Sequence, residues 1–270
     1  DAAAILTDGG NSTLRADTLK VGNLDPARRA ASAATTSTGT LALEARLLDL
    51  VGNFELGGMA TATLTGTEAV RFSGTTTGTV RPTASLRSSA DLAFHGAVVA
   101  PASYTQASIL APGRTVQFTR NTDTPVQPLA ALGSLSVQAE NIVQDGNLWA
   151  PLGQLVFEAS DSLVFRAGSL TSVAADPGSL LPFGKTQNGR SWIVDLDPTK
   201  VPTGQLVQDE LPGKALRVSA QTVDMQAGAK VDLSGGGDLQ AYEFTVGPGG
   251  SRDILADANT YAILPGFAGG

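Results

Sequence analysis

A short motif with strand spacing occurs four times in this chain and constrains its fold more than any other feature. Each copy has two apolar residues two positions apart, then Ala, then a second apolar stretch that ends at Gly. The copies begin at Leu41, Leu135, Leu155 and Leu216, and the second and third are directly consecutive, 20 residues apart. A repeat of two short strands over this length is typical of one coil of a solenoid, so it predicts stacked parallel strands.

The alternation within a copy predicts which side chains face inward. Because successive side chains of a strand point to opposite faces, Leu135, Val137 and Ala139 share one face. The alternation then shifts phase across residues 140–141, which predicts a corner between two strands. In a parallel stack the second and third copies lie side by side, with these neighbours: Leu135 and Leu155, Val137 and Phe157, Ala139 and Ala159.

Proline and glycine mark further corners, at residues 111–113 and 150–153. Proline has no N–H for a ladder and glycine accepts a positive φ, so both suit the turns between strands. We therefore predict an all-β chain folded as a right-handed parallel β-helix with long loop insertions. The alternative is an antiparallel sandwich or jelly roll, which would favour Asn-Gly or Asp-Gly hairpins. Asp145-Gly146 is the only clear instance between two apolar runs.

The clarity of the repeat divides the chain near residue 134. Residues 1–134 are predicted to form irregular β-helix coils with an insertion around 82–128, and residues 135–270 to form regular coils. Segments rich in Pro and Gly predict that loops leave the stack at 176–212 and 235–265. Neither end carries a leader or a tail, so we expect a fragment of a longer exported chain.

Composition excludes several classes of function. The net charge is −7 with scattered Lys and Arg, so no basic stripe is available to bind nucleic acid. With no Cys and only one His, His95, the chain has neither disulfides nor a zinc site of the usual ligands. No stretch approaches the roughly 20 apolar residues of a membrane span. The Gly-rich segments lack the Lys-Ser/Thr of a phosphate loop, and no cofactor is predicted.

Several runs in the second half carry a family resemblance. They are Asn141-Ile-Val-Gln-Asp-Gly-Asn-Leu-Trp-Ala-Pro-Leu-Gly-Gln-Leu155, residues 168–173, Leu181-Pro-Phe-Gly184 with Trp192, residues 231–239, and residues 242–251. Together these runs resemble the filamentous haemagglutinin family of large exoproteins, and most of all its C-terminal region, a domain of unknown function. The resemblance covers about residues 130–265 well and the first 130 residues poorly.

The resemblance implies a location and a role. Members of that family are adhesins that leave a Gram-negative bacterium by two-partner secretion, through a partner outer-membrane transporter. The implied protein is secreted or held at the cell surface, and its partner is a protein or glycan on a host or neighbouring cell. The N-terminal secretion domain of the family, with its Asn-Pro-Asn-Leu type motifs, is missing from this sequence.

Two groups of residues are candidates for binding. Aromatic side chains can stack on sugar rings, although they also cover a solenoid or fix a loop to it. The candidates are Trp149, Trp192, Tyr242 and Phe244. Asp238 and Asp253 follow Gly-rich runs similar to the calcium-binding nonapeptide, but neither copy is complete and the two are not in tandem. A turn that leaves the solenoid explains them better, so no metal site is predicted.

Two groups of charges keep an enzymatic alternative open. Polysaccharide lyases and hydrolases on β-helices use carboxylates with Lys or Arg on an outer face. The nearest groups here are Glu158 and Asp161 with Arg166, and Asp224 and Asp232 with Lys230. Solvated outward charges explain both groups equally well. We predict a structural, adhesive β-helix segment that is not an enzyme, with a carbohydrate-active β-helix as the alternative.

Overall fold

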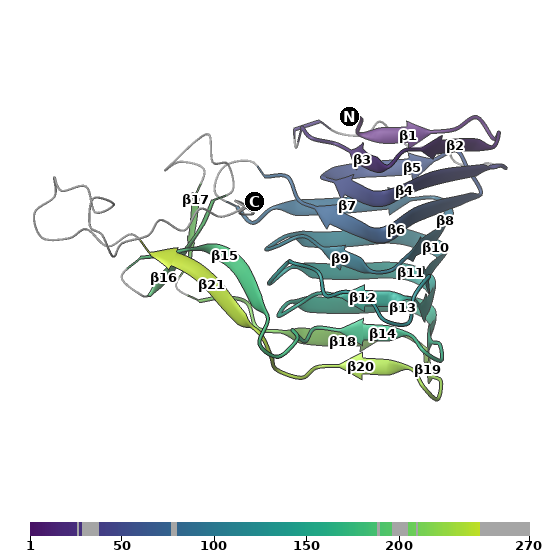
Figure 1. Cartoon of the computed structure of the whole chain (residues 1–270). Coiled ribbons are helices and arrows are strands. Elements are labelled where there is room, and N and C mark those ends of the chain that lie inside the picture. The colour runs from purple at the N-terminus through teal and green to yellow at the C-terminus, as the bar shows by residue number, and fades with distance from the viewer. Residues whose placement is uncertain are drawn as a thin grey trace, which may run out of the picture.

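The protein, seen here in a computed structural model, is built from β-strands. The structure describes residues 1–25, 27–28, 38–76, 80–187, 190–195, 205–208 and 210–243, and no helix occurs among them. None of these residues therefore forms a helix that could cross a membrane. The strands form one 17-stranded sheet, in which all the pairings between strands are parallel, and a separate 4-stranded sheet (Figure 1).

The large sheet consists of three ladders, and the chain passes from one to the next. The first ladder contains β1 (Ala4–Leu6), β5 (Asn53–Gly57), β7 (Thr83–Ser88), the first halves of β10 (Gln106–Arg120), β11 (Ser134–Asp145) and β13 (Gln154–Phe165), and β18 (Ala215–Ser219). The second contains β2 (Ser12–Arg15), the first halves of β4 (Thr40–Val51) and β6 (Thr61–Ser73), β8 (Asp91–Gly96), the second halves of β10, β11 and β13, and β19 (Thr222–Met225). The third contains β3 (Thr18–Gly22), the second halves of β4 and β6, β9 (Val99–Pro101), β12 (Asn147–Trp149), β14 (Leu170–Ser172) and β20 (Lys230–Asp232).

The neighbours predicted from the consecutive copies are confirmed. β11 and β13 pair in parallel with Leu135 beside Leu155, Val137 beside Phe157 and Ala139 beside Ala159. The register shifts after Ala139, at the predicted corner between the first and second ladders. The copy at Leu216 continues the same rows on β18.

The first copy of the motif behaves differently. Leu41 lies on β4 in the second ladder, where it pairs with Ser12 and Ala62, so it is not stacked above the other three copies. The motif encodes a strand with alternating inward side chains followed by a corner. Both the passage from the first to the second ladder and the passage from the second to the third have this form. A shared motif therefore does not guarantee a shared ladder.

Residues 82–128 differ from the expected insertion. They contribute β7, β8, β9 and β10, all paired in register within the three ladders. The turn at Ala111-Pro112-Gly113, with Gly113 at φ 66°, lies in the middle of β10 and turns the chain from the first ladder into the second. Pro and Gly at a corner interrupt the alternation in the sequence without interrupting the stack.

The loops predicted at 176–212 and 235–265 leave the ladders, but they contain strands. β15 (Leu180–Gln187) pairs antiparallel with β16 (Ser191–Asp195), which pairs antiparallel with β17 (Gln205–Gln208). β21 (Asp238–Glu243) pairs parallel with β15 and completes this small sheet beside the stack (Figure 1). The rest of the second loop, from residue 244, lies outside the described residues.

The core is a set of apolar rows that run through the stack. Phe94 and Phe118 are neighbours in the second ladder, with ring centroids 5.1 Å apart and planes at 17°. Phe72 of the third ladder packs on Phe94 at 6.0 Å. All three side chains are buried. Offset stacking of this kind adds to the free energy gained by removing the rings from water.

One polar side chain, Gln144, occupies such an apolar row between Phe118 and Phe165. It is fully buried, and its amide nitrogen donates to the carbonyl oxygens of Gly146 at 3.2 Å and Leu170 at 2.9 Å. Its side-chain oxygen accepts the N–H of Gly146 at 3.3 Å. Because both ends of the amide are satisfied, the row tolerates it.

We expect Phe94→Ala to lower the free energy of unfolding by about 3–5 kcal/mol, because the cavity lies in the middle of an aromatic row that cannot close on it. The measurement is chemical denaturation followed by circular dichroism. Thr63→Ala, an exposed position on the outer face of the same ladder, is the control and should change stability by about 0.5 kcal/mol or less. Equal effects of the two substitutions would contradict the placement of the core.

Candidate functional site

Three large residues with positive φ repeat at one corner of the stack. Tyr104, Leu132 and Leu152 have φ values of 57°, 61° and 54°. Each lies two residues before a strand of the first ladder, at β10, β11 and β13. This backbone region costs a residue other than glycine about 1 kcal/mol or more, so surrounding contacts must hold it.

Backbone hydrogen bonds supply part of that support. The N–H groups of Tyr104, Leu132 and Leu152 donate to the carbonyl oxygens of residues 131, 151 and 173, at 2.9, 3.0 and 3.0 Å. Each corner is thus tied to the next layer of the stack, where a layer is one strand from each of the three ladders. The positive φ turns the three side chains away from the central core and into a second apolar cluster.

The small sheet covers this corner cluster. Leu181 and Phe183 of β15 are buried in it together with Tyr104 and Leu132, and Trp192 of β16 packs against it. The Phe183 ring meets Tyr104 edge-on at 5.5 Å and Trp192 at 6.0 Å. The strained corner therefore provides the surface on which the small sheet is held.

Arg81 connects the first two corner residues. Its Nε donates to the carbonyl oxygen of Tyr104 at 2.8 Å, and its Nη2 donates to that of Leu132. Its guanidinium carbon also lies 4.6 Å from the centre of the Tyr104 ring, which is a cation–π contact. Burial lowers the pKa of Arg81, with Tyr104 acting in the opposite direction, but an arginine side chain keeps its charge in a protein.

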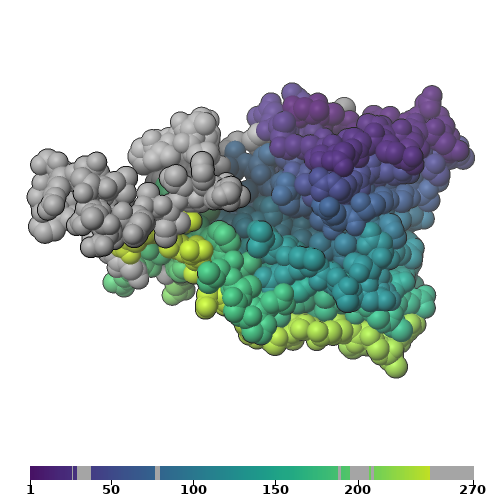
Figure 2. Space-filling view, viewed as in Figure 1, coloured from purple at the N-terminus to yellow at the C-terminus, as the bar shows by residue number. Residues whose placement is uncertain are grey.

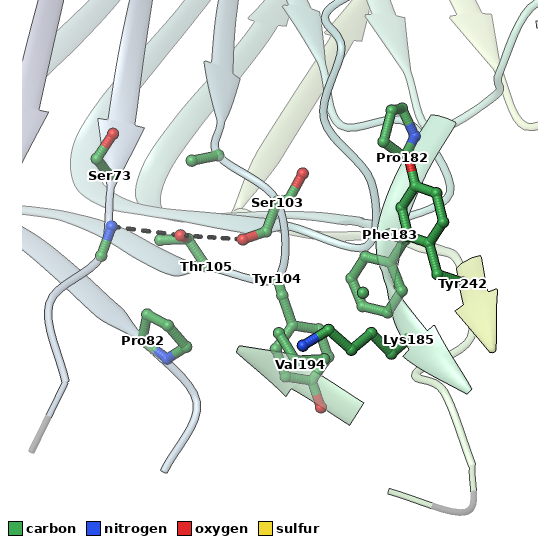
Figure 3. Close-up of a pocket in the computed structure, with 13 residues that line it drawn as sticks. Ser73, Pro82, Ser103, Tyr104, Thr105, Pro182, Phe183, Lys185, Val194 and Tyr242 are labelled. Atoms are coloured by element: carbon green, nitrogen blue, oxygen red, sulfur yellow. Dashed lines mark hydrogen bonds between the residues drawn. The ribbon is translucent and has the colours of Figure 1, made fainter. Parts of the chain in front are cut away.

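A cleft of about 550 Å³ opens between this corner and the small sheet (Figure 3). One wall comes from residues 73–74, 82 and 102–105 of the stack, and the other from residues 182–185, 194 and 242 of the small sheet. The Thr105 hydroxyl accepts a hydrogen bond from the N–H of Gly74 at 3.3 Å, which ties the corner before β10 to the end of β6. Among the described residues that line the cleft, none is Asp, Glu or His.

The lining determines what the cleft can do chemically. Tyr242, Phe183 and Pro182 offer apolar and aromatic surface, while Ser103, Thr105 and Lys185 offer polar groups. Such a mixture suits the binding of a sugar ring or an extended peptide. The titratable groups of the described lining are Lys185 and the two tyrosines, Tyr104 and Tyr242, with no carboxylate or imidazole beside them.

The structure separates the four aromatic residues singled out from the sequence. Tyr242 lines the cleft and Trp192 lies behind it, against Phe183. Trp149 lies elsewhere, 7% exposed, with its indole N–H donating to the carbonyl oxygen of Ala174 at 2.7 Å. It packs with Val98 and is too enclosed to serve as a platform. Phe244 lies outside the described residues.

The two weak calcium candidates are not brought together by the described structure. Asp238 begins β21 with an exposed side chain, and its N–H donates to the carbonyl oxygen of Ser179 at 2.8 Å. Asp253 lies outside the described residues. Within the described part of the chain, no group of three or more His, Asp or Glu side chains could hold a metal ion.

The charged groups behind the enzymatic alternative lie toward the last layers of the stack. Glu158 accepts a hydrogen bond from Gln138, and Asp224 accepts one from Gln226 at 3.3 Å. Asp232 lies 3.4 Å from Lys230, and a hydrogen bond from the Ser234 hydroxyl is the main reason that its pKa is lowered. Asp161 and Arg166 are exposed.

Glu158 also lines a second, shallower cleft of about 560 Å³ on the outer face of the first ladder. Arg87 and the turn at Pro112-Gly113 lie on its other side. Here a residue of the predicted acidic groups shares a cleft with a basic side chain.

We expect Arg81→Ala to destabilise the corner by about 2 kcal/mol, because two carbonyl oxygens lose a charged donor. Thermal unfolding measures this loss, and the near-ultraviolet circular dichroism of Tyr104 and Trp192 should weaken with it. Arg87→Ala, an exposed position on the neighbouring strand, is the control and should leave both unchanged. An Arg81→Ala protein with unaltered stability would contradict the role given to the guanidinium.

No family model, curated protein or solved structure matches this chain. The resemblance to the filamentous haemagglutinin family therefore stays a prediction from the sequence runs that suggested it.

Proposed function

We propose that the three ladders are the faces of a right-handed parallel β-helix that serves as a structural and adhesive segment of a secreted bacterial surface protein. The order in which the chain visits the ladders supports this, because first, second and third follow one another along most of the chain. A stack of this kind gains stability layer by layer, which suits a long extracellular shaft.

The cleft beside the small sheet carries the binding half of the proposal. It combines aromatic and hydroxyl groups on two facing walls, and its described lining holds no Asp, Glu or His. Binding without turnover is what such a lining performs best. The ligand is a protein or glycan on the surface of a host or neighbouring cell.

The cellular setting of the proposal comes from the sequence resemblance. An adhesin of the filamentous haemagglutinin type leaves a Gram-negative cell through a partner outer-membrane transporter and acts at the cell surface. The absence of Cys favours such a route, because no disulfide can form in the periplasm and block passage.

A carbohydrate-active β-helix is the second candidate, and the shallower cleft favours it. There Glu158 and Arg87 line one groove on the outer face of the first ladder, where an acidic polysaccharide would have to lie. Its weakness is that Glu158 already accepts a hydrogen bond from Gln138 and has no second carboxylate among the described residues of that lining.

We expect Tyr242→Ala to weaken attachment of the protein to target cells or an immobilised glycan by about tenfold, because an aromatic wall of the cleft is lost. Surface plasmon resonance against the ligand, or binding of labelled protein to cells, measures this. Thr63→Ala, far from the cleft on the second ladder, should bind as the unchanged protein does. Full binding by Tyr242→Ala would remove this cleft from the proposal.

We expect no new reducing or unsaturated ends when the protein is incubated with acidic polysaccharides, with or without calcium. Release of such ends, and their loss in Glu158→Gln, would replace the adhesive proposal with the carbohydrate-active one. Because Glu158 lies in the shallower cleft, this experiment is independent of the Tyr242 variant.

A further inference from the structure

The layer that contains β10 differs from its neighbours in the third ladder. β9 and β12 belong to the layers on either side of it, and they pair directly, at Val99 and Leu148. Residues 121–133 connect β10 to β11 without forming a strand. This layer lies inside the column, whose colours follow the chain from one end to the other (Figure 2). The connection is therefore a feature of the middle of the stack.

This connection carries the two most exposed large apolar side chains in the described part of the chain. Val126 is 83% and Leu129 82% exposed, whereas the next in order, Val80 and Leu180, are both at 57%. Among the described residues, neither Val126 nor Leu129 belongs to an apolar cluster. A partner that encloses them gains free energy by removing apolar surface from water.

The backbone around these two side chains is extended and unpaired. Pro125 and Pro128 directly precede them, and a residue before proline, such as Thr124 or Gln127, is restricted to the extended region. None of the hydrogen bonds within the described structure involves a backbone N–H or C=O of residues 125–129. The segment therefore resembles a free peptide in an extended conformation.

Side chains hold this extended segment in place. Asp123 forms an ion pair with Arg120 at 2.7 Å. The Gln127 amide nitrogen donates to the Ser179 hydroxyl at 3.2 Å, and its side-chain oxygen accepts the N–H of Asp176. A segment that is already ordered loses less conformational entropy when a partner binds it.

We infer that residues 124–129 are the recognition and cleavage segment for a serine endopeptidase with a small apolar S1 pocket, which takes the Val126 side chain. The combination of an exposed apolar side chain with free backbone groups on an extended chain is what such an active site binds. This partner does not depend on what the cleft beside the small sheet binds.

Two other ways of binding an extended peptide fit less well. Domains that read a Pro-x-x-Pro motif contact the prolines, but Pro125 and Pro128 are only partly exposed. Addition as a strand to the edge of a sheet needs successive N–H groups, and both prolines lack one. The side chains that the segment presents are those between and after the prolines.

The prolines also determine which peptide bond is cut. Endopeptidases cut poorly on either side of proline, because its ring fixes φ and removes the N–H. Within the segment and at its end, this leaves the bonds after Val126 and after Leu129. The bond after Leu129 leads into Ala130 and Ala131, which are 9% and 0% exposed. The bond between Val126 and Gln127 is therefore the one that an active site can enclose.

The reaction is an ordinary hydrolysis in two steps. The enzyme's serine oxygen bonds to the Val126 carbonyl carbon while the bond to the Gln127 nitrogen breaks, and this nitrogen leaves as an amine. Water then attacks the ester, which restores the serine hydroxyl and leaves a carboxylate on Val126. Both new ends stay on the stack, because β10 and β11 remain paired in register.

Pancreatic elastase, whose S1 pocket is small and apolar, is the probe for a test on the full chain. We expect intact-mass analysis to find fragments 1–126 and 127–270, which elute together in size-exclusion chromatography without denaturant. Val126→Lys should slow this cut about tenfold or more. Leu129→Lys, an equally exposed change, should leave the cut after Val126 unchanged.

Trypsin tests the presentation of the segment independently, because its S1 pocket takes Lys or Arg and residues 121–133 contain neither. We expect trypsin to cut Val126→Lys after position 126, to leave residues 121–133 of the unchanged chain intact, and to spare position 129 in Leu129→Lys. Circular dichroism verifies that both variants stay folded. Three results would each overturn the inference: no elastase cut after Val126 in the folded chain at an amount that digests the urea-unfolded chain, no trypsin cut in Val126→Lys, or equal trypsin cutting of both variants.

Discussion

The in-register contact between equivalent side chains of neighbouring layers is the interaction on which the rest of the structure depends. In the row from Leu43 to Phe165 each side chain packs on the residue above and the residue below, not on its neighbours in the sequence. A layer is therefore stabilised mainly by its contacts with the layers next to it. This is why Phe94 is fully buried while Met225, in the same row, is half exposed.

The parts of the fold that were predictable from the sequence are those where the repeat is consecutive and of constant length. The pairing of β11 with β13 followed from two copies 20 residues apart. The ladder to which Leu41 belongs was not predictable. Alternation shows which side chains of a strand point inward, but not which of the three ladders the strand joins. The strands of residues 83–120 were hidden because the corner at Pro112-Gly113 resembles a break in the pattern.

The site was predictable only in part, and the reasons are local. Tyr242 stood out as an aromatic residue in a polar, Gly-rich stretch. Tyr104 and Arg81 did not, because a positive φ at a residue other than glycine leaves no mark in a single sequence. The one signal available was a large apolar residue two positions before each of three first-ladder strands. The burial of Trp149 was not predictable, because it depends on packing against Val98 and Ala100, which are distant in the sequence.

The small sheet shows how such a stack can carry an additional surface without changing its ladders. The chain leaves β14 and rejoins the first ladder at β18 in the register that β13 requires. The free energy needed to close a loop grows only slowly with its length, so a long departure is tolerated if the return is in register. Leu181 and Phe183 then cover Leu132 and Tyr104, corner residues that the stack itself holds in place. The cleft is therefore bounded on one side by the repeating corner and on the other by the small sheet that this long departure forms.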